Sequence, residues 1–328
     1  MPQTQTPIEK LRNISNYILK PDHFHDQLAP AIADYTTLLF DIGAIQPDNV
    51  VDREFIELPY GDAIGTFWAA FCVKEIFRTQ RFCRGLYLAI KDKLAQKEGP
   101  VQVLYAGTGP FAALALPVMI QFSPEEVQFS LLEINQNSYN KLLDVIAAFG
   151  LERYIKRIEI ADATTYVLPD KEIDIVLSET LNRALITEPQ VFIMLNIASQ
   201  LGPDVVYLPQ EIKVNLSTKT RSEKTPTNLK TLINFDLACM KHIISNSNQG
   251  EWLFDEVKYD IGDCETKDLY YTTEIKVYRD NFLGFRDSSL NLLEKVMLDE
   301  KDSKNLFFQY SATQRTGFKV STRSMKLK

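Results

Sequence analysis

The sequence of 328 residues has little of what marks several common protein classes. Its 4 cysteines form no C-x-x-C pair and its 3 histidines are dispersed, so the sequence predicts neither a disulfide framework nor a zinc site. His23 and His25 lie near two aspartates, but a solvated polar loop between helices explains them better than a metal site. No apolar run approaches the roughly 20 residues of a membrane-spanning helix, and the first residues lack the apolar core of a signal peptide. We therefore expect a cytoplasmic protein with no membrane partner, whose cysteines are small buried hydrophobes.

Concentrated positive charge is also missing. The 43 acidic and 36 basic residues give a formal net charge of −7, which argues against a nucleic-acid-binding surface and is compatible with a cationic substrate. Hydrophobic residues make up 45% and charged residues 24%, as in ordinary globular proteins. A chain of this length can bury the cores of two packed units.

Three regions differ in their hydrophobic pattern: a helical N-terminal region (1–95), an α/β domain (96–203) and a C-terminal β domain (204–328). In the first region apolar residues recur at helical spacing, and one long helix is predicted from Thr66 to Leu94. In the second, short apolar runs alternate with helical stretches, which predicts a parallel sheet with right-handed crossovers. Period-two patterns in the third predict an antiparallel, barrel-like domain. The fold class is therefore α/β, with a Rossmann-like domain between helices and a β domain.

A candidate nucleotide-binding loop follows the first predicted strand of the α/β domain. The strand 101–104 leads into Tyr105-Ala106-Gly107-Thr108-Gly109, where glycines allow a tight turn and a close approach to a ligand. Pro110 fits the first turn of a helix, because its missing N–H costs nothing there. Phe111 stands where a dinucleotide-binding fingerprint has its third glycine, so NAD is disfavoured.

Acids end the next two predicted strands. Glu133 closes the strand 129–133 and can accept both hydrogen bonds from a ribose diol. Asp162 ends the third strand, where it could meet an adenine amino group. For each acid the alternative is an ordinary solvated carboxylate. The order of glycine loop, ribose acid and third-strand aspartate resembles that of class I methyltransferases, and the resemblance implies S-adenosylmethionine (SAM) as the cofactor.

The fourth predicted strand ends in Ser178-Glu179, and a second glutamate, Glu188, follows nine positions later. Taken separately, Glu179 could be an ordinary strand-end acid, and Glu188 could belong to a helix-capping box with Thr187. Together they resemble the double-glutamate loop of protein arginine methyltransferases. A guanidinium is a planar cation with a fork of N–H donors, so two carboxylates can clamp it and aim one nitrogen at the sulfonium methyl. They also offset the repulsion between the guanidinium and a cationic cofactor.

The resemblance covers roughly residues 70–280 and implies further roles. Arg78 matches the arginine that the family supplies to the cofactor carboxylate, with Arg84 as a substitute. Tyr207–Gln210 resembles the crossing into the family's β-barrel. Asn234–Lys241 is similar to a stretch of its dimerisation arm, which implies a homodimer.

The chain also departs from the family's pattern. An acid usually stands where this chain has Tyr105, and Trp-Met-Gly usually follows the first glutamate where it has Thr180-Leu181-Asn182. The Thr-His-Trp signature of the barrel is missing. These changes remodel the wall around the substrate, so we expect N-methylation of the guanidinium of a small molecule, with free L-arginine favoured.

Three alternatives remain open. They are methylation of arginine in a protein or peptide, O- or N-methylation in natural-product assembly with Glu179 as general base, and an inactive SAM-binding scaffold. No metal is expected. The predicted site residues are Glu179 and Glu188 for catalysis and, for the cofactor, Arg78, Tyr105, Ala106, Gly107, Gly109, Glu133, Asp162, Ala163 and Glu179.

Overall fold

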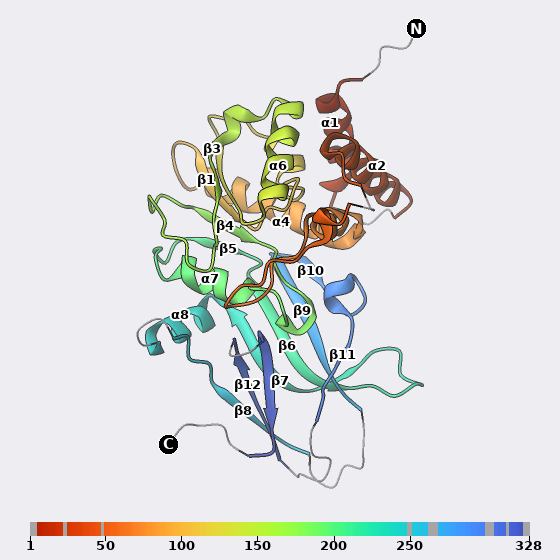
Figure 1. Ribbon diagram of the computed structural model, residues 1–328, viewed down its shortest axis with the longest axis vertical. Coiled ribbons are helices and arrows are strands. Elements are labelled where there is room, and N and C mark those ends of the chain that lie inside the picture. Colours follow the sequence, from red (N-terminus) through yellow and green to blue (C-terminus); the bar gives the residue numbers. More distant parts are fainter. Residues whose placement is uncertain are drawn as a thin grey trace.

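The computed structural model describes residues 5–21, 25–46, 49–247, 251–261, 268–298, 305–312 and 315–323. Helices of the N-terminal region lie against a parallel sheet with its own helices, and antiparallel strands form the other half of the molecule (Figure 1). His23, part of the rejected metal motif, and Cys264 lie outside the described residues. Within the described part, no three His, Cys, Asp or Glu side chains gather as a metal site would require, and no helix combines the length and apolarity needed to cross a membrane.

Two helices, α1 (Pro7–Ile18) and α2 (His25–Gly43), open the chain as their hydrophobic spacing predicts. Thr6 and Glu9 form a reciprocal capping box at the start of α1, and Pro7 takes the first helical position, where no N–H is needed. The two helices contact each other, α1 also contacts α4 and α5, and α2 also contacts α6. The N-terminal region is therefore packed onto the α/β domain. A short turn, η1 (Val51–Arg53), follows.

The single helix predicted over 66–94 is wrong. The chain forms three pieces instead: α3 (Thr66–Phe71), the 3-10 turn η2 (Cys72–Lys74) and α4 (Ile76–Leu94). Glu75, at the break, has an extended backbone with ψ 100°. Its carboxylate accepts hydrogen bonds of 2.6 Å from the backbone N–H and the hydroxyl of Ser289. Because this partner lies far along the chain, helical periodicity alone does not reveal the break, which places Arg78 in the first turn of α4.

The parallel sheet has the strand order β3-β2-β1-β4-β5. Its strands are β1 (Val101–Ala106), β2 (Val127–Glu133), β3 (Ile155–Ile160), β4 (Ile175–Ser178) and β5 (Val206–Leu208). The central strands β1, β2 and β4 are buried almost throughout, which explains their continuous apolar runs. β5 follows residue 203, the expected end of the α/β domain, and pairs with β4 in this sheet. The strand order reverses between β1 and β4, where open α/β sheets bind their ligands at the carboxyl edge.

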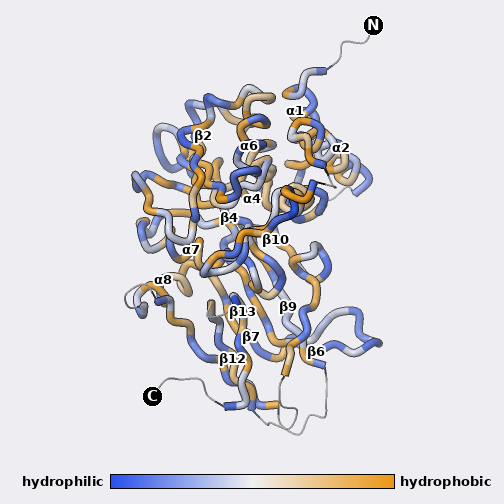
Figure 2. Tube along the Cα trace, in the orientation of Figure 1, coloured by the Kyte–Doolittle hydropathy of each residue, from blue (hydrophilic) through white to orange (hydrophobic). Residues whose placement is uncertain are grey.

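The connections of this domain contain α5 (Leu116–Met119), α6 (Gln136–Phe149), η3 (Glu152–Tyr154), η4 (Arg183–Leu185) and α7 (Gln190–Ala198). The helix predicted to begin at Pro110 is wrong, because residues 109–115 form turns before the short α5. Ala112 has a φ of +47°, which a right-handed helix does not accommodate. Apolar residues concentrate along α7, whose residues are nearly all buried (Figure 2).

The C-terminal half consists of antiparallel strands, as predicted, arranged in two sheets among the described residues. One contains β10 (Asn281–Leu283), β9 (Leu269–Tyr278), β6 (Glu211–Thr218) and β7 (Thr227–Asp236), with β11 (Glu294–Lys295) also pairing with β9 after the turn η5 (Ser289–Asn291); the other contains β13 (Gly317–Ser321), β12 (Asn305–Ser311) and β8 (Glu256–Asp260). Tyr271 of the first sheet lies with ring centroids 6.3 Å from Phe308 and 5.5 Å from Phe318 of the second. Aromatic rings therefore join the two sheets.

A helix, α8 (Leu237–Asn246), occupies the segment that resembles a dimerisation arm. The Asp236 carboxylate caps it by accepting the Cys239 N–H at 2.9 Å. Met240 and Ile243, each 2% exposed, are buried, and α8 packs on α7 of the same chain (Figure 1). The chain itself thus covers the apolar face that motivated the homodimer, and the homodimer stays a prediction.

Replacing Phe308 with alanine should destabilise the protein by about 3–5 kcal/mol, because the ring is fully buried in the aromatic contact between the two sheets. Urea titration would measure the change. Phe307→Ala is the matched control, since Phe307 neighbours Phe308 in β12 but faces the other side and is partly exposed. Equal losses in the two variants would contradict the packing described here.

Candidate active site

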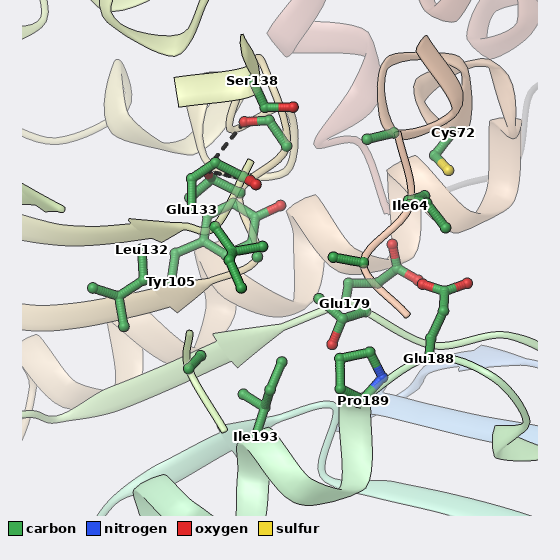
Figure 3. A pocket seen from close by; sticks show the side chains of 18 of the residues that line it. Ile64, Cys72, Tyr105, Leu132, Glu133, Ser138, Glu179, Glu188, Pro189 and Ile193 are labelled. Carbon is green, nitrogen blue, oxygen red and sulfur yellow. Dashed lines mark hydrogen bonds between the residues drawn. The ribbon is translucent and has the colours of Figure 1, made fainter. Parts of the chain in front are cut away.

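An open cavity lies at the carboxyl ends of β1, β2 and β4, beside the reversal of strand order. Counted together with the open solvent at its mouth, it spans about 950 Å³. Its lining includes the segment 58–64, the turn between α3 and α4, the start of α4, the glycine loop (residues 105–109), the ends of β2 and β3, and the loop after β4, residues 179–189, called the carboxylate loop below (Figure 3).

The cavity brings together the residues predicted from the sequence, with one exception. Ala106 is fully buried in β1 and does not line it. Arg84, considered as a substitute for Arg78, is placed elsewhere and donates a 2.8 Å hydrogen bond to the Lys20 carbonyl oxygen. The predicted residues that line the cavity are Arg78, Tyr105, Gly107, Gly109, Glu133, Asp162, Ala163, Glu179 and Glu188.

The glycine loop needs its glycines. Gly107 and Gly109 have φ values of +74° and +60°, a backbone region that favours glycine. A Cβ on Gly107 would lie 2.1 Å from the Thr180 side chain, so any other residue would collide with the loop after β4. The backbone of the glycine loop at Gly107 therefore packs directly against the Thr180 side chain of the carboxylate loop.

Glu133 ends β2 and is 6% exposed. Its carboxylate accepts hydrogen bonds from the Asn135 N–H at 2.9 Å and from the Thr108 hydroxyl at 3.4 Å. Burial raises its pKa, and hydrogen bonds from neighbouring backbone N–H groups oppose that rise. The result is a buried carboxylate held in one orientation at the cavity wall.

Asp162 follows β3 and has a local partner. Its Oδ1 accepts hydrogen bonds from the backbone N–H and hydroxyl of Thr164, at 2.8 and 2.7 Å. This turn is an ordinary role for an aspartate after a strand. Since Asp162 also lines the cavity, its Oδ2 is the atom that remains for a ligand.

Glu179, directly after β4, forms a short ion pair with Arg78 of α4. Arg78 also donates a 3.0 Å hydrogen bond to Glu75, so the helix break and the carboxylate loop share one guanidinium. The side chains of Arg78 and Glu179 are 7% and 6% exposed. The second oxygen of Glu179, Oε1, is buried and has no hydrogen-bond partner among the described residues. A buried acceptor left in this state is costly unless a ligand supplies a donor.

Glu188, at the far end of the loop, points toward Glu179 across the cavity (Figure 3). Burial, followed by the charge of Glu179, raises the pKa of Glu188 to about 8. Burial also raises the pKa of Glu179 to about 7, although Arg78 opposes the shift. Two like charges thus share a poorly hydrated space, and a cation placed between them would relieve both costs.

Helix capping does not account for Glu188. The helix α7 begins at Gln190, with Pro189 at the N-cap and no side-chain cap. The Thr187 hydroxyl donates to the neighbouring carbonyl oxygen of Ile186 instead. The capping box considered from the sequence is therefore absent, and the carboxylate of Glu188 accepts no hydrogen bond from the described part of the chain.

The backbone between the two glutamates is strained. Ala184, Leu185 and Thr187 have φ values of +56°, +56° and +69°, which is uncommon for residues other than glycine and least favourable for a β-branched one. Such conformations persist only where the surroundings hold them, and they cluster at functional sites.

The C-terminal half holds this loop. The Thr273 hydroxyl accepts the Ala184 N–H at 2.8 Å, and the Tyr310 hydroxyl donates to the Leu185 carbonyl oxygen at 2.7 Å. The Thr187 N–H donates to the Thr316 carbonyl oxygen at 3.1 Å. Strands remote in sequence therefore set the position of Glu188.

The segment 54–65, called the strap below, was not predicted as part of the site. Its residues Leu58, Asp62 and Ile64 line the cavity. In the sequence it looks like a polar connection with Pro and Gly between two helical regions, and only Gly61 signals a close backbone approach. Its role follows from contacts with the carboxylate loop that no local pattern encodes.

Comparisons with known proteins add a general likeness. No family model matches the chain, and no curated protein does. Solved structures similar to it include a Trypanosoma brucei PRMT1 enzyme–prozyme heterotetrameric complex with AdoHcy, with 13% identity and a TM-score of 0.44 over 73% of this chain and 85% of that one. Arabidopsis thaliana protein arginine methyltransferase 10 has 12% identity and a TM-score of 0.41 over 71% of this chain and 84% of that one. PRMT6 has 11% identity and a TM-score of 0.44 over 73% of this chain and 94% of that one. Identities and scores this low decide neither the cofactor nor the substrate of this chain.

Glu188→Gln should raise the melting temperature at alkaline pH. The pKa of Glu188 is about 8 in the folded state, against an ordinary value of 4.5, so the folded protein binds a proton that the unfolded chain releases between these values. This group's contribution is constant below about 4.5 and falls as pH rises toward about 8. The variant's advantage in a thermal melt should be largest near pH 9 and should shrink toward pH 4.5. An advantage independent of pH would contradict the assignment.

Tyr310→Phe should loosen the carboxylate loop while leaving the aromatic packing in place. Losing the hydroxyl donor to Leu185 should cost about 0.5–1.5 kcal/mol, concentrated in the strained backbone. Hydrogen exchange of the 180–189 amides should accelerate severalfold. Tyr278→Phe is the matched control, because its hydroxyl donates to Asp92 away from the loop. Equal exchange in the two variants would show that Tyr310 does not hold the loop.

Proposed function

We propose that this protein is a SAM-dependent N-methyltransferase that acts on a guanidinium group. The observation that carries the proposal is the pair Glu179 and Glu188, which converge in one cavity, both with pKa values raised by burial and with Glu179 Oε1 lacking a partner. A guanidinium is always charged and offers several N–H donors in one plane, so it can neutralise both carboxylates and satisfy the orphaned oxygen.

The charge of the whole cavity supports a cationic ligand set. Arg78 is the one basic side chain of the lining, against the acids Asp62, Glu133, Asp162, Glu179 and Glu188. An anionic substrate, such as a phosphate, would be repelled by this lining. A sulfonium and a guanidinium together suit it.

The residues present fit SAM. Gly107 and Gly109 line the cavity in a loop whose positive φ values favour glycine, and Glu133 presents a fixed carboxylate of the kind that binds a ribose diol. Arg78 keeps N–H donors beyond those given to its two glutamate partners and could hold a carboxylate. When bound, SAM supplies an electrophilic methyl group.

The protein's own side chains would bind and orient the substrate. Glu179 and Glu188 must be ionised to hold a guanidinium, so kcat/KM should rise with pH until both carboxyl groups, with pKa values of about 7 and 8, have lost their protons. The strained loop keeps Glu188 in position, and the strap limits the access of water.

The substrate that carries the guanidinium is either free arginine, favoured from the sequence, or arginine in a polypeptide. The three similar structures are arginine methyltransferases, one named in full as acting on protein, and this agrees with the polypeptide alternative. Free arginine has no support from them. A panel of both substrate kinds, incubated with SAM and analysed by mass spectrometry, orders them directly.

Glu179→Gln and Glu188→Gln should each lower kcat/KM by about 10²–10³, because each removes one charge from a dry site without changing shape. The double variant should lose less than the product of the two, since both acids hold one substrate. SAM affinity measured by calorimetry should survive in Glu188→Gln, because Glu188 is not among the predicted cofactor ligands. Glu133→Ala is the complementary variant and should weaken SAM binding at least about tenfold.

Near-full activity in Glu188→Gln would overturn the guanidinium assignment. Glu179, with its pKa of about 7, would then act alone as a general base, and an O-methyltransferase would become the better assignment. Undetectable SAM binding by the wild type would overturn the cofactor as well.

A further inference from the structure

A third acid, Asp62, lines the cavity near Glu188, and neither the proposed guanidinium clamp nor the proposed SAM contacts involve its carboxylate. It lines the cavity and its charge contributes to the raised pKa of Glu188. Its carboxylate makes no hydrogen bond or ion pair with the described residues. Asp62 is partly exposed, so its carboxylate is open to a ligand that enters the cavity.

The strap holds Asp62 in place through its backbone. Its N–H donates to the Thr187 carbonyl oxygen at 2.7 Å. Gly61, with a φ of +127°, approaches the carboxylate loop so closely that a Cβ would lie 2.6 Å from that same oxygen and 2.9 Å from the carbonyl carbon of Glu188. No other residue could bring the strap this near.

Further contacts hold the strap against the rest of the protein. Ile56 and Ala63 exchange two backbone hydrogen bonds of 2.9 Å. The Tyr60 ring stacks on Phe192 with centroids 4.9 Å apart, and the Thr316 hydroxyl donates to the Tyr60 carbonyl oxygen at 2.8 Å. The backbone position of Asp62 is therefore set before any ligand arrives.

Among Glu179, Glu188 and Asp62, the acids around the proposed guanidinium, Asp62 is the one without a compensating charge. Glu179 is paired with Arg78 and keeps a buried, unpartnered oxygen that points to a donor-bearing ligand in this cavity. A guanidinium supplies those donors and compensates Glu188, but it carries a single positive charge. The rest of a substrate longer than the guanidinium must lie along the remaining lining of the cavity, which includes Asp62. A second cation there would compensate the third acid.

We propose that Asp62 is a specificity-determining residue and that the substrates are guanidines bearing a second positive charge a few bonds from the guanidinium. This inference rests on the proposed function. The second charge contacts Asp62 while the guanidinium lies between Glu179 and Glu188. Guanidinium compounds without a second charge bind less well. Those that carry a carboxylate at that distance also bind less well, because Asp62 repels the carboxylate.

Two isosteric probes test the charge alone. Agmatine ends in an ammonium and n-pentylguanidine in a methyl group of similar size, and the ammonium stays charged at pH 8 because alkyl ammonium pKa values are near ~10. Wild type should show a kcat/KM at least about threefold higher for agmatine, the size expected of a partly exposed ion pair. In Asp62→Asn the ratio should fall to about one. 5-Guanidinopentanoate should be the poorest substrate of wild type and should improve in the variant.

Glu57→Gln is the matched control, because it removes one negative charge from the same strap at an exposed residue outside the cavity lining. It should leave the agmatine preference unchanged. Calorimetry of the same probes with S-adenosylhomocysteine present repeats the comparison as binding. If no guanidine is methylated, the proposed function fails, and the binding ratio still tests Asp62. Equal use of both probes by wild type, or a preference that survives in Asp62→Asn, overturns the inference.

Discussion

The structure depends on keeping two carboxylates, Glu179 and Glu188, in one poorly hydrated cavity with a single basic side chain to offset them. Burial opposes the charge of each, and each opposes the other. Because burial is costly for a charged carboxylate, a loop without tertiary contacts would expose Glu188 to solvent. It is held because three separate parts of the chain fasten the loop: the C-terminal strands at Ala184 and Leu185, the strap at Thr187, and α7 at its far end. The positive φ values in the loop and the raised pKa values of Glu179 and Glu188 have the same cause, because these contacts hold both carboxylates in the cavity.

A second constraint joins the halves of the molecule. The Glu75 carboxylate binds Arg78 on its own helix and Ser289 in the C-terminal half, while Arg78 binds Glu179 in the α/β domain. One ion-pair network thus connects the helix break, the carboxylate loop and the turn η5. The side chains of Arg78 and Glu179 are only 7% and 6% exposed. Removing either one would leave the charge of the other uncompensated in a buried place, which costs far more than the loss of an exposed pair. The broken helix is therefore part of the site and not a defect in packing.

These features explain how an enzyme of the proposed kind would trade stability for binding. A cavity with five acids and one arginine is unfavourable when empty and becomes favourable when cations enter it. The resulting selectivity is for charge before shape. The strap adds a third acid, Asp62, to the same lining, so the proposed selectivity for charge extends from Glu179 and Glu188 to Asp62.

The sequence by itself determined the parts of the site that depend on strand ends. Glu133 and Glu179 end buried apolar runs, Gly107 and Gly109 follow another, and parallel strands bring their carboxyl ends to one edge, so these residues could be placed together from pattern alone. Only the tertiary structure decided the helix break at Glu75, the turns after Pro110, the packing of α8 on its own chain and the presence of Asp62 in the cavity lining. The reason is range: periodicity records which face of a segment is buried, whereas these features are set by hydrogen bonds and close contacts between residues up to more than 200 positions apart, as between Glu75 and Ser289.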